Sequence, residues 1–205
     1  MRIITGLAKG MPLVAPRSGV RPTSDRARSA IFSILGDHVV GARVLDLFAG
    51  TGALGLEAAS RGAAAVTFVE NAREALKCLE SNVAEFIKRL QGGCEPRWAT
   101  RPTKETAATA LQVAPSDVPA VLRRMVAEGH RFSLVFADPP YGEIAQELLR
   151  DPRLPRLVED DGLFVLESAK HEALPVGAPW QLVREATYGD TRVSFLRHGA
   201  SPGRG

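Results

Sequence analysis

The chain has 205 residues, of which 45% are hydrophobic and 24% are charged, a composition typical of a globular protein with one sizeable core. No apolar run approaches the roughly 18 residues that a transmembrane helix needs, and the N-terminus lacks the apolar core of a signal peptide. The two cysteines, Cys78 and Cys94, match no metal-binding spacing, so the sequence predicts no metal site and a reducing cytoplasm as the location.

The excess positive charge of the chain lies at its N-terminus. Residues 1–28 hold six basic side chains and one acidic side chain, a balance of +5, whereas the other 177 residues hold 20 basic and 22 acidic ones, a balance of −2. A basic segment on a nearly neutral body is typical of phosphate contact, although a solvated terminal extension is the alternative. The side chains that we expect to bind phosphate are Arg2, Lys9, Arg21, Arg26 and Arg28.

The first predicted elements form an N-terminal extension over residues 1–36. Residues 2–5 and 12–15 are predicted to pair as a small hairpin, followed by a helix that Thr23 or Ser24 caps and that ends near Leu35. Apolar side chains at i, i+3 and i+4 spacing predict that one face of this helix packs on the body: Ala27, Ala30, Ile31, Ile34 and Leu35. Arg26 and Arg28 fall outside that stripe.

Strands and helices then alternate over residues 37–198. We expect strands over 43–48, 65–70, 97–100, 132–137 and 163–167, and helices over about 53–61, 72–90 and 118–128. A final pair of strands, about 181–187 and 192–197, is joined through Gly189 and Asp190 as a hairpin. Alternating β and α elements indicate a parallel sheet, to which the hairpin adds an antiparallel strand. Residues 199–205 are expected to be a disordered tail.

A glycine-rich motif follows the first of these strands. Residues 44–55 predict a buried strand, a tight turn and the start of a helix whose amide N–H groups favour a bound carboxylate. The spacing of Gly50, Gly52 and Gly55 fits G-x-G-x-x-G, which is also found in dinucleotide-binding proteins. Asp46, at the strand end, suits the amino group of S-adenosylmethionine better than a pyrophosphate, which it would repel. A role for Asp46 as a helix or turn cap is the alternative.

Glu70 ends the second predicted strand, about twenty residues past the turn, where an acid can hold both hydroxyls of a ribose. Phe48 either lines the same pocket or belongs to the core. Residues 100–103, after the expected third strand, offer no acidic side chain to the adenine, which leaves backbone groups to bind it. With S-adenosylmethionine as the cofactor, the predicted cofactor-binding residues are Asp46, Phe48, Gly50, Thr51, Gly52 and Glu70.

A second motif, Asp138-Pro139-Pro140-Tyr141, follows the apolar run 132–137 and so lies at the carboxyl end of a strand, where α/β sheets bind ligands. The two prolines stiffen a loop that presents carbonyl oxygens. The Asp138 carboxylate and the Pro139 carbonyl can both accept hydrogen bonds from a planar exocyclic amino group, while Tyr141 stacks on the base that carries it. These four residues predict methylation of a nucleobase amino group; an ordinary proline turn is the alternative.

With both motifs present, the chain resembles the bacterial 16S ribosomal RNA guanine-N2 methyltransferases of the RsmD type. The resemblance covers nearly the whole chain and includes residues 2–6, 21–28, 45–57 and 138–141, of which 21–28 is the family-specific part. It implies the class I S-adenosylmethionine-dependent methyltransferase fold, Rossmann-like, with a seven-stranded, mostly parallel sheet and a short N-terminal extension. It also implies a monomer that methylates one guanine of 16S RNA in an assembled or partly assembled small subunit.

Three other functions remain open from the sequence. A DNA adenine-N6 methyltransferase, or another amino-group methyltransferase, uses the same Asp-Pro-Pro-Tyr chemistry, but a DNA enzyme usually needs a target-recognition segment for which 205 residues leave little room. A small-molecule or protein-glutamine methyltransferase gains nothing from the basic segment. A non-enzymatic RNA-binding module leaves Asp46, Glu70 and Asp138 without a role.

Glu167, which ends the fifth predicted strand, either faces the base or caps a turn.

Overall fold

The computed structural model describes residues 1–16, 25–91, 110–140 and 142–199. Seven strands lie within these ranges: β1 (Arg43–Leu47), β2 (Ala65–Glu70), β3 (Ala110–Pro115), β4 (Phe132–Ala137), β5 (Val158–Ala169), β6 (Trp180–Tyr188) and β7 (Thr191–His198). The helices in the same ranges are α1 (Asp25–Leu35), the short 3-10 turn η1 (Gly36–Val39), α2 (Ala53–Ser60), α3 (Arg73–Gln91), α4 (Val118–Ala127), α5 (Ile144–Arg150) and α6 (Leu154–Leu157).

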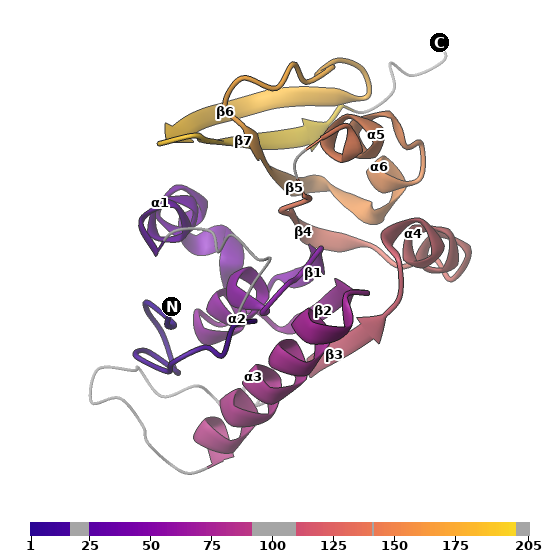
Figure 1. Ribbon diagram of the computed structural model, residues 1–205. Coiled ribbons are helices and arrows are strands. Elements are labelled where there is room, and N and C mark those ends of the chain that lie inside the picture. Colours follow the sequence, from indigo (N-terminus) through magenta and orange to yellow (C-terminus); the bar gives the residue numbers. More distant parts are fainter. Residues whose placement is uncertain (17–24, 92–109, 141, 200–205) are drawn as a thin grey trace.

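All seven strands form one sheet in the order β3-β2-β1-β4-β5-β7-β6 (Figure 1). Strands β1 to β5 pair in parallel, and β7 pairs antiparallel with both β5 and β6. The first strand, β1, lies in the middle of the sheet. Strands β2 and β3 follow outward on one side of it, and β4 is added on its other side. This arrangement confirms the predicted class I methyltransferase fold, including the antiparallel strand that the C-terminal hairpin inserts.

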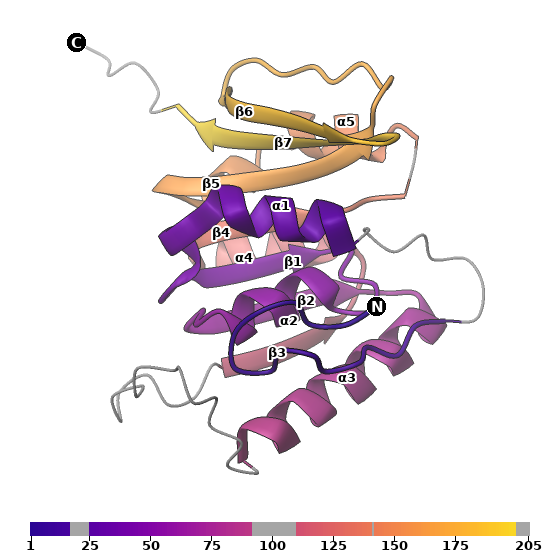
Figure 2. The same cartoon turned by 90° about the vertical axis from the view of Figure 1, so that its left-hand side faces the viewer.

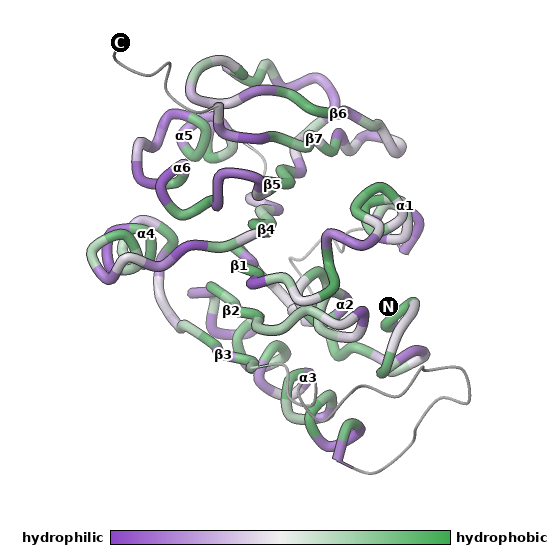
Figure 3. The backbone as a smooth tube through the Cα atoms, turned by 180° about the vertical axis from the view of Figure 1, so that it is seen from behind, coloured by the Kyte–Doolittle hydropathy of each residue, from purple (hydrophilic) through white to green (hydrophobic). Residues whose placement is uncertain are grey.

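Helices cover both faces of the sheet. Helices α1, α2 and α3 pack with Val44, Phe68 and Phe136 in one apolar cluster, whereas α4, α5 and α6 pack with Leu45 and Phe164 in another. Successive strand residues therefore enter opposite clusters, and both are apolar because a parallel sheet is buried on both sides. Hydrophobic stretches accordingly recur along strands and helices alike in Figure 3. We call the side covered by α1, α2 and α3 the site face, and the other side the support face.

Residues 1–16 pack against the site face, in front of α2 and α3 in Figure 2. The predicted hairpin is present in reduced form, as a single antiparallel bridge between Arg2 and Pro12 flanked by backbone hydrogen bonds. Glu57 of α2, which is fully buried, accepts hydrogen bonds from the amides of Ile4 and Thr5, at 2.7 and 3.1 Å. The N-terminal segment is therefore held to the body by a buried carboxylate.

Two further polar side chains hold the same segment. The Ser60 hydroxyl of α2 accepts from the amide of Ala8 at 2.9 Å. Asn82 of α3 pairs with the backbone of Val14 in both directions, and its amide also donates to the carbonyl of Thr51 in the glycine-rich loop at 2.9 Å. These contacts join residues 31 to 68 positions apart, which no local pattern could have predicted.

Arg28 is buried, contrary to the prediction that it lies outside the apolar stripe of α1. It is 0% exposed, and its Nη2 donates to the carbonyl of Arg2 and to Asp25, the latter at 2.8 Å. The buried face of α1 is therefore centred closer to Arg28 and Phe32 than to the half-buried Ala30. A stripe of apolar residues cannot reveal a buried guanidinium whose Nη2 is bound by Asp25 and by a distant backbone carbonyl. We no longer count Arg28 among the residues that bind phosphate.

The strand β3 was not predicted. The expected strand over 97–100 lies outside the described residues, and β3 is Ala110–Pro115, which ends in a proline. Pro115 is tolerated because it is the last residue of a strand at the edge of the sheet. The short helices α5 and α6 were also missed, and β5 begins at Val158, five residues before its predicted start. Residues 200–205 of the expected tail lie outside the described residues.

Candidate active site

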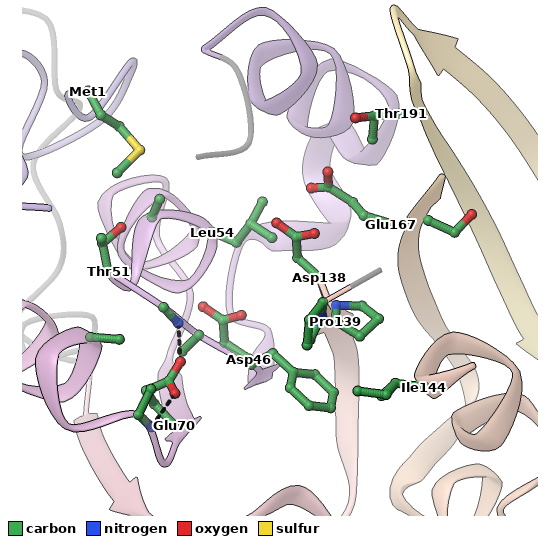
Figure 4. A pocket seen from close by; sticks show the side chains of 18 of the residues that line it. Met1, Asp46, Thr51, Leu54, Glu70, Asp138, Pro139, Ile144, Glu167 and Thr191 are labelled. Atoms are coloured by element: carbon green, nitrogen blue, oxygen red, sulfur yellow. Dashed lines mark hydrogen bonds between the residues drawn. The ribbon is translucent and has the colours of Figure 1, made fainter. Parts of the chain in front are cut away.

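Four carboxylates lie along the carboxyl edge of the sheet (Figure 4). Glu70 ends β2, Asp46 lies on β1, Asp138 follows β4, and Glu167 lies near the end of β5, so their order is that of the strands. Each stands two residues after a member of the apolar cluster on the site face: Phe68, Val44, Phe136 and Val165. Side chains two residues apart on a strand share a face. All four carboxylates therefore project on the site face at the edge where parallel sheets bind ligands.

These carboxylates line a cavity of about 910 Å³. The glycine-rich loop forms one wall, and Asp138, Pro139 and Pro140 form another. Met1, Arg26 of α1 and residues 187–191 at the turn between β6 and β7 complete it. The volume is near the upper end of the 300–1,000 Å³ or so typical of ligand pockets, which is consistent with two ligands meeting in one site. The two predicted motifs, 86 residues apart at Gly52 and Asp138, share this single cavity.

The glycine-rich loop has the tight turn predicted for it. Phe48, Gly50 and Gly52 all have positive φ, at 57°, 56° and 80°, a conformation that is costly for the phenylalanine. A Cβ added at Gly55 would approach Phe68 Cε1 to 2.3 Å and Asp46 Oδ2 to 2.9 Å, so only glycine lets α2 pack this closely. The loop therefore brings the start of α2 directly onto the end of β1, with Phe48 and Thr51 lining the cavity.

Asp46 is the carboxylate beneath this loop. It is 1% exposed and accepts a hydrogen bond from the amide of Gly55 at 2.9 Å. The pKa of Asp46 is raised to about 7, mainly by burial and also by the negative charges of Asp138 and Glu70, while the Gly55 hydrogen bond opposes the shift. A cation in the cavity would reverse this shift, because it would stabilise the ionised carboxylate.

Glu70 holds the backbone of two loops together. One carboxylate oxygen accepts from the amide of Gly50 at 2.8 Å, and the other accepts from the amides of Asn71 and Ala72, both at 2.8 Å. These bonds fix the glycine-rich loop against the end of β2. The structure thus shows Glu70 shaping the cavity wall, while its contact with ribose hydroxyls stays a prediction.

Asp138, Pro139 and Pro140 extend β4 into the cavity. The last residue of β4, Ala137, pairs with Leu47 of β1 and Leu166 of β5, so the motif begins between the glycine-rich loop and Glu167. Figure 4 shows the Asp138 carboxylate between those of Asp46 and Glu167. Tyr141 lies outside the described residues, and its stacking role stays a prediction.

The predicted basic residues divide into three groups. Arg2 and Lys9 are exposed on the N-terminal segment, and Arg26, also exposed, lines the cavity from α1. Arg28 is buried, as described above, and pairs with Asp25. Arg21 lies outside the described residues. Helix α1 therefore faces the cavity through Arg26 instead of lying remote from it.

Sequence reasoning missed parts of the site that distant segments contribute. Met1 and the turn between β6 and β7 carry no motif, and only the tertiary structure brings them to the cavity. For Glu167 a signal existed, because Leu163, Val165 and Glu167 alternate on one side of β5. The sequence analysis found no acidic side chain for the adenine in residues 100–103, which follow the expected third strand. The observed strand β3 ends at Pro115, and Asp117 follows it. The Asp117 carboxylate accepts from the amide of Ala120 at 2.7 Å and caps α4.

Comparisons with known proteins agree over nearly the full chain. Residues 1–197 match the family model described as "Conserved hypothetical protein 95". Ribosomal RNA small subunit methyltransferase D of Escherichia coli (strain K12) is 34% identical over 203 residues, which cover 98% of this chain and 91% of the relative. The solved structure of the Escherichia coli protein yhhF is 32% identical with a TM-score of 0.74, and the match covers 98% of this chain and 99% of that one.

A more distant match supports the fold alone. The protein SMU.776, solved in complex with SAH, is 15% identical with a TM-score of 0.60, and the match covers 84% of this chain and 49% of that one.

Within the described ranges, no helix combines the length and the apolar character needed to cross a membrane.

Proposed function

The chain belongs to the Conserved hypothetical protein 95 family, which includes the ribosomal RNA small subunit methyltransferases D, and we propose that it methylates the exocyclic N2 of a guanine in 16S ribosomal RNA. The observation that carries this proposal is the single cavity into which both Asp138-Pro139-Pro140 and the glycine-rich loop project. One wall suits a methyl donor and the adjacent wall suits a planar amino group. The relative named for small-subunit RNA supports the choice of acceptor.

The donor side of the cavity fits S-adenosylmethionine. The Asp46 carboxylate is buried beside the loop and is positioned to accept hydrogen bonds from the cofactor's amino group. The start of α2 directs its amides at the cofactor's carboxylate, and Glu70 accepts from the ribose hydroxyls. Phe48, Gly50, Thr51 and Gly52 line the space between them. A buried carboxylate with a raised pKa is unfavourable unless a cation joins it, which is the chemistry that this cofactor offers.

On the acceptor side, Asp138 and the carbonyl of Pro139 accept the two N–H bonds of guanine N2. This favours a pyramidal nitrogen whose lone pair points toward the methyl group, so most of the acceleration comes from positioning and exclusion of water. When bound, S-adenosylmethionine would supply the methyl group as an electrophilic carbon, and its sulfur would keep the electron pair of the bond to that carbon. The N2 proton then leaves to Asp138 or to water.

The acceptor guanine must leave its RNA stack to reach Asp138, and Tyr141 stacks on the displaced base. Arg2, Lys9 and Arg26 contact RNA phosphates around it, together with Arg21. Arg26 is placed best among these, because it lies at the cavity itself. We propose that the enzyme acts as a monomer, in the cytoplasm, on an assembled or partly assembled small subunit.

Nucleoside mass spectrometry of small-subunit RNA from cells with and without the gene tests this proposal. We expect N2-methylguanosine at one position to disappear without the gene, to return with the wild-type gene, and to stay absent with Asp138→Ala. Unchanged N2-methylguanosine in cells without the gene would contradict it. N6-methyladenine in DNA, measured in the same cells, tests the alternative function, because a DNA adenine methyltransferase would change that product instead.

A further inference from the structure

We propose that Glu167 selects guanine by accepting a hydrogen bond from N1–H of the acceptor base, beside the N2 group that Asp138 holds. This inference rests on the proposed function, and it assigns a specificity-determining role to a residue outside both sequence motifs. It also chooses between the two roles that the sequence left open for Glu167.

The strand register places Glu167 beside Asp138. Ala137 of β4 pairs with Leu166 of β5, so Asp138 and Glu167 are the next residues along two neighbouring parallel strands. Both line the cavity, and Figure 4 shows their carboxylates next to each other on its acceptor side. Neighbouring strands are about 4.8 Å apart, which lets two carboxylates reach adjacent donors on one edge of a single base.

The surroundings of Glu167 support a polar ligand instead of a solvated charge. Glu167 is 3% exposed, and a buried carboxylate is costly unless charges or hydrogen-bond donors stabilise it. The buried guanidinium of Arg28 is close enough to Glu167 for electrostatic attraction, which raises the pKa of that guanidinium against the larger lowering by burial. Arg28 is itself fixed by Asp25 and the carbonyl of Arg2. The structure thus places a buried guanidinium near the Glu167 carboxyl group.

A carboxylate that accepts hydrogen bonds at this position distinguishes guanine from adenine. Guanine presents two neighbouring donors on its Watson–Crick edge, N1–H and the N2 amino group, which match two neighbouring carboxylates. Adenine presents a lone pair at N1, which Glu167 would repel in a site from which water is excluded. Sites that hydrogen-bond a substrate donor reject analogues without it strongly, because a buried polar group is then left unpaired. Glu167 therefore favours methylation of guanine N2 over adenine N6.

A single base replacement in the RNA tests this role. In small-subunit RNA lacking N2-methylguanosine, the acceptor guanosine located by mass spectrometry is replaced by 2-aminopurine riboside, and the RNA is assembled into subunits. This base keeps the N2 amino group but carries a lone pair at N1. We expect wild-type protein to methylate it at least about 100-fold more slowly than guanine in a single turnover.

In the Glu167→Gln variant, the rate on guanine should exceed the rate on 2-aminopurine by less than about 10-fold. The carboxamide N–H can donate to the N1 lone pair of 2-aminopurine, whereas the rate on guanine falls. The missing O6 of 2-aminopurine affects both proteins equally and cancels in the comparison. Glu159→Gln is the matched control, since Glu159 is half-buried at the opposite end of the same strand and lies outside the cavity. It should keep the wild-type ratio.

Each outcome separates this inference from the proposed function. If Glu167→Gln discriminates between the two bases as strongly as wild-type protein does, the role of Glu167 is wrong while the guanine methyltransferase stands. If wild-type protein forms no N2-methylguanosine on the guanine-containing subunit, the proposed function itself fails. Should the glutamine variant not fold, Glu167→Met, which is apolar and of similar size, should also narrow the ratio because it neither attracts N1–H nor repels a lone pair.

Discussion

The two faces of the sheet are equally buried but chemically different. Among the described residues, the buried charged side chains are Arg28, Asp46, Glu57 and Glu167, and all four lie on the site face. The support face is filled by apolar side chains such as Phe164, whose ring lies 5.1 Å from that of Trp180, and the indole N–H of Trp180 donates to the carbonyl of Leu149. The same sheet thus carries its binding chemistry on one side and an ordinary core on the other.

This difference indicates how stability and function are divided. Charges on the site face are costly to bury. Asp46 and Glu167 line the cavity, where a ligand can stabilise them, whereas Glu57 and Arg28 bind the backbone of the N-terminal segment. Side chains on the support face contribute mainly through burial of apolar surface. Substitutions on the site face should therefore change binding or catalysis more than folding, and substitutions on the support face should do the reverse.

The largest effect is expected at Asp138. Asp138→Ala removes the acceptor that orients the amino group, so single-turnover methyl transfer should fall by about 100- to 10,000-fold. Cofactor affinity, measured by calorimetric titration, should stay within a few-fold of wild type. Asp138→Asn keeps one oxygen acceptor and should retain part of the activity if the role is positioning. A wild-type rate in Asp138→Ala would show that the catalytic assignment is wrong.

The next largest effect is expected from Leu122, which is buried on α4 against the support face. Leu122→Ala removes buried apolar volume and should lower the free energy of unfolding by about 2–5 kcal/mol in a urea titration. Because no residue of α4 lines the cavity, cofactor affinity at a temperature where the variant is folded should not change. A marked loss of affinity in the folded variant would mean that the two faces are not independent.

Asp46→Asn should change stability and binding in opposite directions. Loss of the carboxylate charge should weaken S-adenosylmethionine binding by about 1.5–3 kcal/mol. Without cofactor, the free energy of unfolding of the same variant should exceed that of wild type by up to about 4 kcal/mol at pH 8. The buried charge is gone, and the amide oxygen can still accept from the amide of Gly55. Calorimetry and thermal unfolding measure the two effects.

The pH dependence of the stability gained by Asp46→Asn follows from the raised pKa of Asp46. The folded protein binds a proton at Asp46 more tightly than the unfolded chain does, so Asp46 lowers wild-type stability as pH rises from the ordinary value of 3.8 to about 7. The advantage of Asp46→Asn should be absent below about pH 4, grow between pH 4 and 7, and stay constant above. A gain that does not vary with pH would contradict burial of an ionising carboxylate at this position.

The smallest effect is expected from the exposed basic residues. Replacing Lys9 and Arg26 together by alanine should weaken binding to small-subunit RNA and reduce its dependence on salt by a little under one unit of slope per lost phosphate contact. Arg123 and Arg124, exposed on α4, are the control, since their replacement removes the same charge from the other side of the molecule. If the Lys9 and Arg26 variant loses cofactor affinity but keeps its salt dependence, Arg26 serves the cofactor instead of RNA.

The contiguous motifs could be predicted from sequence because their function depends on local geometry. The turn at Gly50 and Gly52 and the stiff loop at Pro139 and Pro140 each follow a buried strand, and a strand end is recognisable without knowing its neighbours. Alternation of strands and helices likewise indicated a parallel sheet before any pairing was known. Strand β3 was not predicted, because most of its residues are exposed or only half-buried and because it ends in proline, which an edge strand tolerates.

Other features depended on contacts between distant segments. Arg28 is polar by every local measure, yet it is buried, and its Nη2 donates to the carbonyl of the distant Arg2 as well as to the nearby Asp25. Alternation along β5 placed Glu167 on one side of its strand, but only the strand order put β5 beside β4 and so Glu167 beside Asp138. By itself, the sequence located the two motifs to which we assign methyl transfer. The tertiary structure alone decided which of them share a cavity, because register and strand order come from packing over the whole chain.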